Sequence, residues 1–191
     1  ASLVSALGGV DKLLLISGSE VGQRIPQHEN VINAAQRVNV SLIAYTSIAN
    51  ALTGNMKLAQ EHVATEQLLA GSGIEYVLLR NGWYTENYTD QLLGYINSGV
   101  VLGAAGNGRI SAAPRADYAE AAAAVLLSEE NESGKIYELG GDKAFTLSQL
   151  AGAVGAAAGQ EVNYQEVEPE KLVAIYTESG VPAQFADILV D

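Results

Sequence analysis

The sequence predicts an α/β protein built on a doubly wound parallel sheet. Short β-rich runs alternate with longer helical patterns along the chain, and the apolar residues in the runs LLLIS, LIAYT and YVLLR are continuous rather than alternating with polar ones. The alternation is typical of right-handed βαβ units. Continuous apolar runs indicate strands that helices cover on both faces.

The first half of the chain predicts three such units. We expect strands over 13–17, 42–46 and 74–80, followed respectively by helices over 26–39, 57–72 and 85–97. Gly8 and Gly9 suggest the C-cap of a helix over 1–8, before the first of these strands. The chain is therefore expected to begin inside a βαβ unit and to be a fragment.

After residue 99 the pattern changes. The runs 100–103 and 109–112 flank a glycine-rich segment and indicate either a short strand pair or an irregular loop. An alanine-rich helix over 116–127, a strand over 135–139 and an edge strand over 162–167 follow. Thr146 and Gln149 form a plausible capping box for a helix that reaches about residue 158, and Pro169 and Pro182 are each expected to open a helix.

Composition excludes several functions. With 22 acidic against 10 basic residues, the formal net charge is −12, which disfavours binding to nucleic acid or to anionic membranes. The absence of cysteine excludes disulfides, thiolate metal sites and a cysteine nucleophile. We find no targeting signal or membrane-spanning run, and expect a cytoplasmic protein.

Candidate binding residues lie in the loops that follow the predicted strands, because ligands of open parallel sheets bind beyond the carboxyl ends of the strands. These loops are 18–22, the segment from Ser47, 81–86 and 140–142. Each also has a purely structural interpretation. Gly18 and Gly22 suit a turn, and the segment NGWYTENY suits a helix start packed on the sheet with Thr85 as N-cap.

The remaining candidates have weaker support. His62 and His28 lie on predicted helices, where a lone histidine is more often a core or surface residue than an acid–base catalyst. Asp117 suits the dipole of its helix, and Arg115 is an open choice between a ligand contact and a surface role. No HExxH, nucleophile elbow or phosphate-binding GxxxxGK[ST] motif is present, so hydrolase and NTPase chemistry lose support.

Several of these segments resemble one known family. LLLISGSEVGQR, AYTS, LLRNGWYTENY, GAAGNGRISAAPRADYAEAAA and KIYELGG are similar to the bacterial NAD(P)H:quinone oxidoreductases of the NmrA-like atypical short-chain dehydrogenase group, with triphenylmethane reductases as near neighbours. SGSEVGQR and RNGWYTENY are the most specific parts. The resemblance implies a Rossmann-like fold: residues 1–99 as the remainder of a dinucleotide-binding domain, and residues 100–191 as a mixed, substrate-side region with a returning strand over 135–139.

The resemblance also implies site residues. It places cofactor contacts at Ser19, Glu20, Val21, Asn81, Gly82, Trp83, Tyr84, Thr85 and Glu86. It places the acceptor at Trp83, Tyr84 and Arg115. The expected cofactor is NADPH, with NADH as the alternative, and the expected partner is a small quinone-like molecule. A homo-oligomer is allowed, and no catalytic residue or metal site is assigned.

This sequence departs from the wider family in two respects. It carries neither a glycine-rich fingerprint of a first βα turn nor a YxxxK pair, so NADPH binding by this chain alone is expected to be weak. Hydride transfer to a quinone suits a site without Tyr–Lys acid catalysis, because the acceptor is already electrophilic. The alternatives are a dinucleotide-sensing regulatory protein without turnover and a fragment with no activity of its own.

Overall fold

The computed structural model describes residues 2–191 and divides the chain into two units. The first unit comprises the chain up to Gly82 together with Ala116–Leu139, and the second comprises Trp83–Arg115 and Gly140–Asp191. This division differs from the contiguous one expected at residue 99, because the alanine-rich helix and the strand after it return to the first sheet.

The first unit contains a four-stranded parallel sheet in the order β1-β2-β3-β5. Its strands are β1 (Lys12–Leu15), β2 (Leu42–Ile48), β3 (Glu75–Asn81) and β5 (Ile136–Leu139). All four lie within two residues of the predicted positions. The predicted parallel sheet is therefore confirmed.

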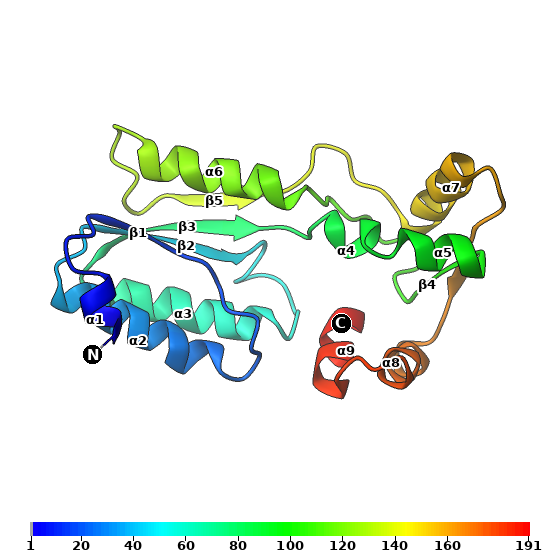
Figure 1. Ribbon diagram of the computed structural model, residues 1–191, viewed down its shortest axis with the longest axis horizontal. Helices are drawn as coiled ribbons and strands as arrows, with labels where there is room; N and C mark the ends of the chain where they lie inside the picture. The colour runs from blue at the N-terminus through cyan, green and yellow to red at the C-terminus, as the bar shows by residue number, and fades with distance from the viewer. Residues whose placement is uncertain (1) are drawn as a thin grey trace. The chain divides into compact units, whose positions relative to one another are not determined.

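Helices cover both faces of this sheet, as the continuous apolar runs predicted. Figure 1 shows α2 (Arg24–Arg37) and α3 (Ala59–Ser72) on one face and α6 (Arg115–Leu127) on the other. The short helix α1 (Ser2–Ala6) contacts α2. Every residue of β2 is buried, because this strand has a neighbour on each side and a helix layer on each face.

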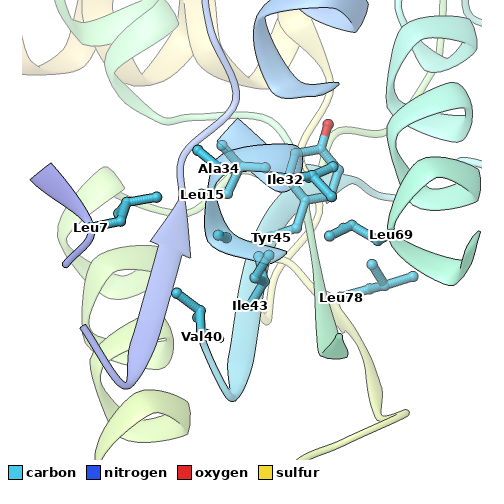
Figure 2. Close-up of a cluster of buried hydrophobic side chains, with 10 residues drawn as sticks. Leu7, Leu15, Ile32, Ala34, Val40, Ile43, Tyr45, Leu69 and Leu78 are labelled. Atoms are coloured by element: carbon cyan, nitrogen blue, oxygen red, sulfur yellow. The ribbon is translucent and has the colours of Figure 1, made fainter. Parts of the chain in front are cut away.

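Alternate residues of the strands supply two separate cores. Ile43 and Tyr45 pack with Ile32, Leu69 and Leu78 beneath α2 and α3, as Figure 2 shows. On the opposite face, a second cluster joins strands to α6 and contains Leu42, Ala44, Val77, Leu79, Ala122 and Val125. Burial of Ala122 and Val125 in this cluster is the reason why α6 belongs to the first unit.

The second unit is built around a small parallel sheet. β4 (Val100–Gly103) pairs with β6 (Asn163–Glu166), and α7 (Leu147–Ala158) packs on the pair through Ala151 and Val154. Residues 109–112 form a loop, with a single bridge from Ile110 to Phe145. Of the two alternatives for this segment, the irregular loop is therefore confirmed.

In the second unit, the predicted helix starts at Thr146, Pro169 and Pro182 are confirmed, whereas one predicted helix is divided in two. Thr146 and Gln149 form the capping box of α7, and Pro169 and Pro182 stand at the starts of α8 (Pro169–Glu178) and α9 (Ala183–Val190). The single helix expected over 85–97 is instead two helices, α4 (Glu86–Thr89) and α5 (Leu92–Ser98). Gln91 leaves helical geometry between them, with φ −103° and ψ 2°.

Candidate functional site

The carboxyl ends of β1, β2 and β3 lie at one edge of the first sheet, as predicted, because the strands pair in parallel. The loop at 18–22 and the residue Gly82 both follow this edge. β2 lies between the two strands that precede them. The backbone N–H of Ser17 donates to Oγ1 of Thr46 over 2.8 Å, which ties the end of β1 to β2.

The loop that follows β1 is fixed at both of its ends. At one end, the N–H of Gly18 donates to Nε2 of His28 over 3.1 Å, and Nε of Arg24 donates to the Gly18 carbonyl. At the other end, the N–H of Gly22 donates to Oε1 of Glu61 over 2.9 Å. Between these anchors, the apex is solvent-facing: Ser19 and Glu20 are exposed and Val21 is half-buried.

Asn81 offers a buried acceptor at the same edge. Its side chain is buried, and no described residue hydrogen-bonds to its Oδ1 atom. Its backbone is fully engaged in the sheet edge, since its carbonyl accepts the N–H of Ala49 over 2.8 Å. Leaving a buried amide oxygen without a donor costs about 1–3 kcal/mol. An N–H or O–H group from a ligand would remove that cost.

A network of charged side chains centred on buried Arg80 lies just below this edge, and no sequence motif indicated its partners. Nε and Nη2 of Arg80 donate to the two carboxylate oxygens of Glu66 over 2.9 and 2.7 Å, and Nη1 donates to Glu138 over 3.0 Å. Glu66 also accepts the hydroxyl of Ser47 over 2.6 Å, and Glu138 accepts the N–H of Asn50 over 2.9 Å. The only available signal was an arginine at the end of an apolar run.

Both histidines are buried. Burial lowers the pKa of His62 to about 3 and also lowers the pKa of His28. Nδ1 of His62 and the Tyr45 hydroxyl share a hydrogen bond of 2.9 Å. A neutral, enclosed imidazole cannot exchange protons readily with a substrate at neutral pH, so the structure favours the structural interpretation of His62.

The remaining predicted residues belong to the second unit. Trp83 and Thr85 pair with Ala113 through backbone hydrogen bonds of 3.1 and 3.0 Å. The Arg115 guanidinium lies 5.5 Å from the centroid of the Tyr84 ring, a cation–π distance. The structure therefore brings Tyr84 and Arg115 together, as two of the three residues expected at the acceptor.

Glu86 makes hydrogen bonds within the protein, and Thr85 stands at the start of a helix. The Glu86 carboxylate accepts the backbone N–H of Arg115 over 3.0 and 3.1 Å, so it caps the first residue of α6. Thr85 stands at the N-cap position of α4, but its side chain makes no capping hydrogen bond.

The second unit also has a groove of about 630 Å³ that the sequence did not indicate. It is lined by Asp90, Gln91, Gly94, Tyr95, Ser98, Val100, Leu102, Gln165 and Tyr176. Burial raises the pKa of Tyr95 to about 12, so its phenol stays protonated at neutral pH. None of the predicted site residues lines this groove.

Two classes of site are not indicated by the part of the chain that the structure describes. Across residues 2–191, His, Asp and Glu side chains nowhere gather in a group that could hold a metal ion. Among the helices described, none has the length and apolar character needed to cross a membrane.

A loop presented beyond the carboxyl ends of parallel strands is typical of dinucleotide-binding α/β proteins. Residues 1–129 match the family model described as NAD(P)H-binding. The chain belongs to this NAD(P)H-binding family.

Individual relatives show which NAD(P)H-binding proteins the chain is similar to. The chain is 53% identical over all 191 residues to quinone oxidoreductase 2 of Escherichia coli K12, and covers 66% of that protein. A crystal structure of the NADPH-dependent quinone oxidoreductase from Escherichia coli with NADPH matches 99% of this chain and 66% of its own chain, with 53% identity and a TM-score of 0.94. The resemblance predicted from SGSEVGQR and RNGWYTENY is confirmed.

A triphenylmethane reductase is also similar, as expected. The structure of the Citrobacter sp. enzyme with NADP(H) is 37% identical, with a TM-score of 0.90 over 98% of this chain and 66% of its own. The chain thus spans slightly less than two thirds of the length of these relatives.

Proposed function

We propose that the protein reduces a quinone, or a similar flat electrophilic acceptor, with NADPH as the hydride donor. The observation that carries this proposal is the 53% identity to the Escherichia coli quinone oxidoreductase over the full 191 residues. NADPH would supply the hydride, and one proton from water would complete the two-electron reduction to the hydroquinone. NADH is the alternative donor.

The residues at the sheet edge fit such a cofactor. Ser19, Glu20 and Val21 would contact it from the loop apex, where their backbone is held in place from both ends. Oδ1 of Asn81 would accept a hydrogen bond from it, which would satisfy the buried oxygen that has no partner among residues 2–191. The small residue Gly82 would leave room for a close approach.

Residues of the second unit would hold the acceptor. Trp83 and Tyr84 provide aromatic faces for a flat ring, and Arg115, already beside Tyr84, would donate to a quinone oxygen and stabilise the negative charge that forms there. Thr85 remains a proposed contact of the same segment. Glu86 would act by holding the start of α6 through the Arg115 N–H.

A cytoplasmic site of action is part of the proposal, because such an enzyme needs a supply of reduced dinucleotide. Turnover also separates the proposal from its alternative, a dinucleotide-sensing regulator. NADPH binding without oxidation would favour the regulator.

The test is NADPH oxidation by the complete protein with 1,4-benzoquinone. We expect steady turnover. We also expect Trp83→Ala to raise KM for the quinone more than KM for NADPH, because an aromatic wall positions the acceptor, while Trp83→Phe keeps most of the activity. No oxidation of NADPH in the presence of quinone would contradict the proposed function, and equal losses for both substrates would contradict the role of Trp83.

A further inference from the structure

The apex at Ser19–Val21 is exposed or half-buried, so its conformation depends on hydrogen bonds: Nε2 of Gln27 donates to the Glu20 carboxylate, and the anchors at Gly18 and Gly22 hold its two ends. The anchor at Gly18 is made by His28, a residue of α2 that does not reach the solvent. His28 is 3% exposed and its partner Thr65, on α3, is 0% exposed. Both side chains are therefore shielded from solvent.

The hydrogen bonds of His28 have a fixed direction. The Gly18 N–H can only donate, so Nε2 of His28, 3.1 Å away, must carry a lone pair. The imidazole proton is then on Nδ1, which lies 2.9 Å from Oγ1 of Thr65 and donates to it. The Thr65 hydroxyl in turn donates a hydrogen bond to the backbone carbonyl of Glu61 over 3.0 Å. A directional chain thus runs from the loop to the backbone of α3.

The surroundings of His28 support the neutral form that this chain requires. Burial is the main cause of its lowered pKa, and the positive charge of Arg24 on the same helix adds to it, whereas Glu61 on α3 opposes it. Tyr45 of β2 packs edge-on against the imidazole, with ring centroids 5.6 Å apart. The ring is therefore held in orientation as well as in protonation state.

We infer that His28 is a positioning residue for cofactor binding: it sets the conformation of Ser19–Val21 through the Gly18 N–H, and Thr65 selects the tautomer that allows it to do so. This inference rests on the proposed function, because Ser19–Val21 is the loop proposed to contact NADPH.

Three variants of the complete protein test this role. Thr65→Val keeps the shape of the side chain but removes the acceptor for Nδ1–H, and His28→Leu removes the acceptor for Gly18. His28→Gln places an amide oxygen within reach of the Gly18 N–H and should restore part of the function. The matched control is His62→Leu, since His62 is also buried but hydrogen-bonds to the Tyr45 hydroxyl rather than to Gly18.

Two measurements are needed. Amide hydrogen exchange over residues 17–23 of the free protein reports on the loop itself, and titration with NADPH together with steady-state kinetics reports on binding. We expect faster exchange in Thr65→Val and His28→Leu, with Kd and KM for NADPH raised roughly three- to tenfold, as the loss of one hydrogen bond predicts. The value of kcat should stay within about twofold of wild type.

The outcomes are distinct. Unchanged exchange and NADPH affinity in Thr65→Val and His28→Leu would overturn the inference, and so would equal changes in His62→Leu. If His28→Leu does not fold, the conservative Thr65→Val variant decides. Failure of the wild type to bind NADPH or to reduce a quinone would instead overturn the proposed function, and the exchange measurement, which needs no cofactor, would still decide whether His28 shapes the loop.

Discussion

Arg80 brings a permanent positive charge into the end of β3, directly after the apolar run Val77–Leu79. The side chain is only 8% exposed, and Glu66, its main partner, is equally buried. Removing two charges from water is expensive, and good geometry only offsets that cost. The pair is therefore weak evidence for added stability, but either partner left alone would be strongly unfavourable.

We predict that Glu66→Gln lowers the free energy of unfolding by about 2–3 kcal/mol, because Arg80 would keep only the half-exposed Glu138 as a carboxylate partner. Urea unfolding measures the loss. The control is Glu130→Gln, which breaks the exposed pair with Lys135 and should cost less than about 0.5 kcal/mol. Similar losses in both variants would show that burial of the Arg80 pair does not matter.

Candidate site residues could be proposed from the sequence only where their motif was local. The family resemblance carried by SGSEVGQR and RNGWYTENY implied the proposed contacts at Ser19–Val21 and Asn81. The role of His28 could not be predicted in this way, because it depends on Thr65, which lies 37 residues away and meets His28 only after α2 and α3 pack side by side.

At the scale of elements, the N-terminus of α7 is the helix start that the sequence predicts best. Oγ1 of Thr146 accepts the N–H of Gln149 over 3.1 Å, and Oε1 of Gln149 accepts the N–H of Thr146 over 3.0 Å. Two N–H groups that the helix itself cannot satisfy thus find partners within four residues. Such a start is visible in sequence because every partner is local.

We predict that Thr146→Ala destabilises the second unit by about 1 kcal/mol, the usual cost of a lost N-cap. Ser148→Ala is the control, since Ser148 is exposed within the same helix and alanine has the better helix propensity there. Thermal unfolding should show a lower Tm for Thr146→Ala and an equal or higher Tm for Ser148→Ala. A lower Tm for both variants would contradict the capping role.

Strand positions were predictable, but strand partners outside the main sheet were not. The strands β1, β2 and β3 are visible in the sequence as apolar runs. Their parallel direction follows from the helices that connect them. The partner of β4 is β6, whose residues lie 63 positions further along the chain than the β4 residues they pair with, and no local pattern indicates that pairing. The break between α4 and α5 was missed because the apolar spacing continues through it.

At the scale of the whole chain, the division into units follows packing rather than sequence order. The chain leaves the first unit after Gly82 and returns at Ala116, because Ala122 and Val125 complete a core on the strands. The sequence analysis anticipated the return of the strand over 135–139 but not that of the helix before it, since an alanine-rich helix fits many surfaces.

Both histidines link the stability of the protein to pH. In the unfolded chain each would titrate near the ordinary value of 6.5, whereas burial lowers the pKa of His62 to about 3 in the folded protein and also lowers that of His28. Arg24 adds to both shifts by its positive charge, and His28 adds to that of His62. Below about pH 6.5 the unfolded chain therefore binds protons that the folded protein refuses, and the free energy of unfolding falls as the pH falls.

We predict that acidification from pH 7 to pH 5 destabilises the protein, with His62 alone contributing about 2 kcal/mol of the loss. This interval lies mostly above the range in which ordinary carboxylates titrate, so the histidines dominate the change. Urea unfolding at several pH values gives the slope for the wild type and for His62→Gln. The variant starts less stable, because it loses the contact with Tyr45, but its slope should be shallower. A slope equal to that of the wild type would mean that His62 takes up its proton in the folded protein, and that its imidazole is more accessible than its burial implies.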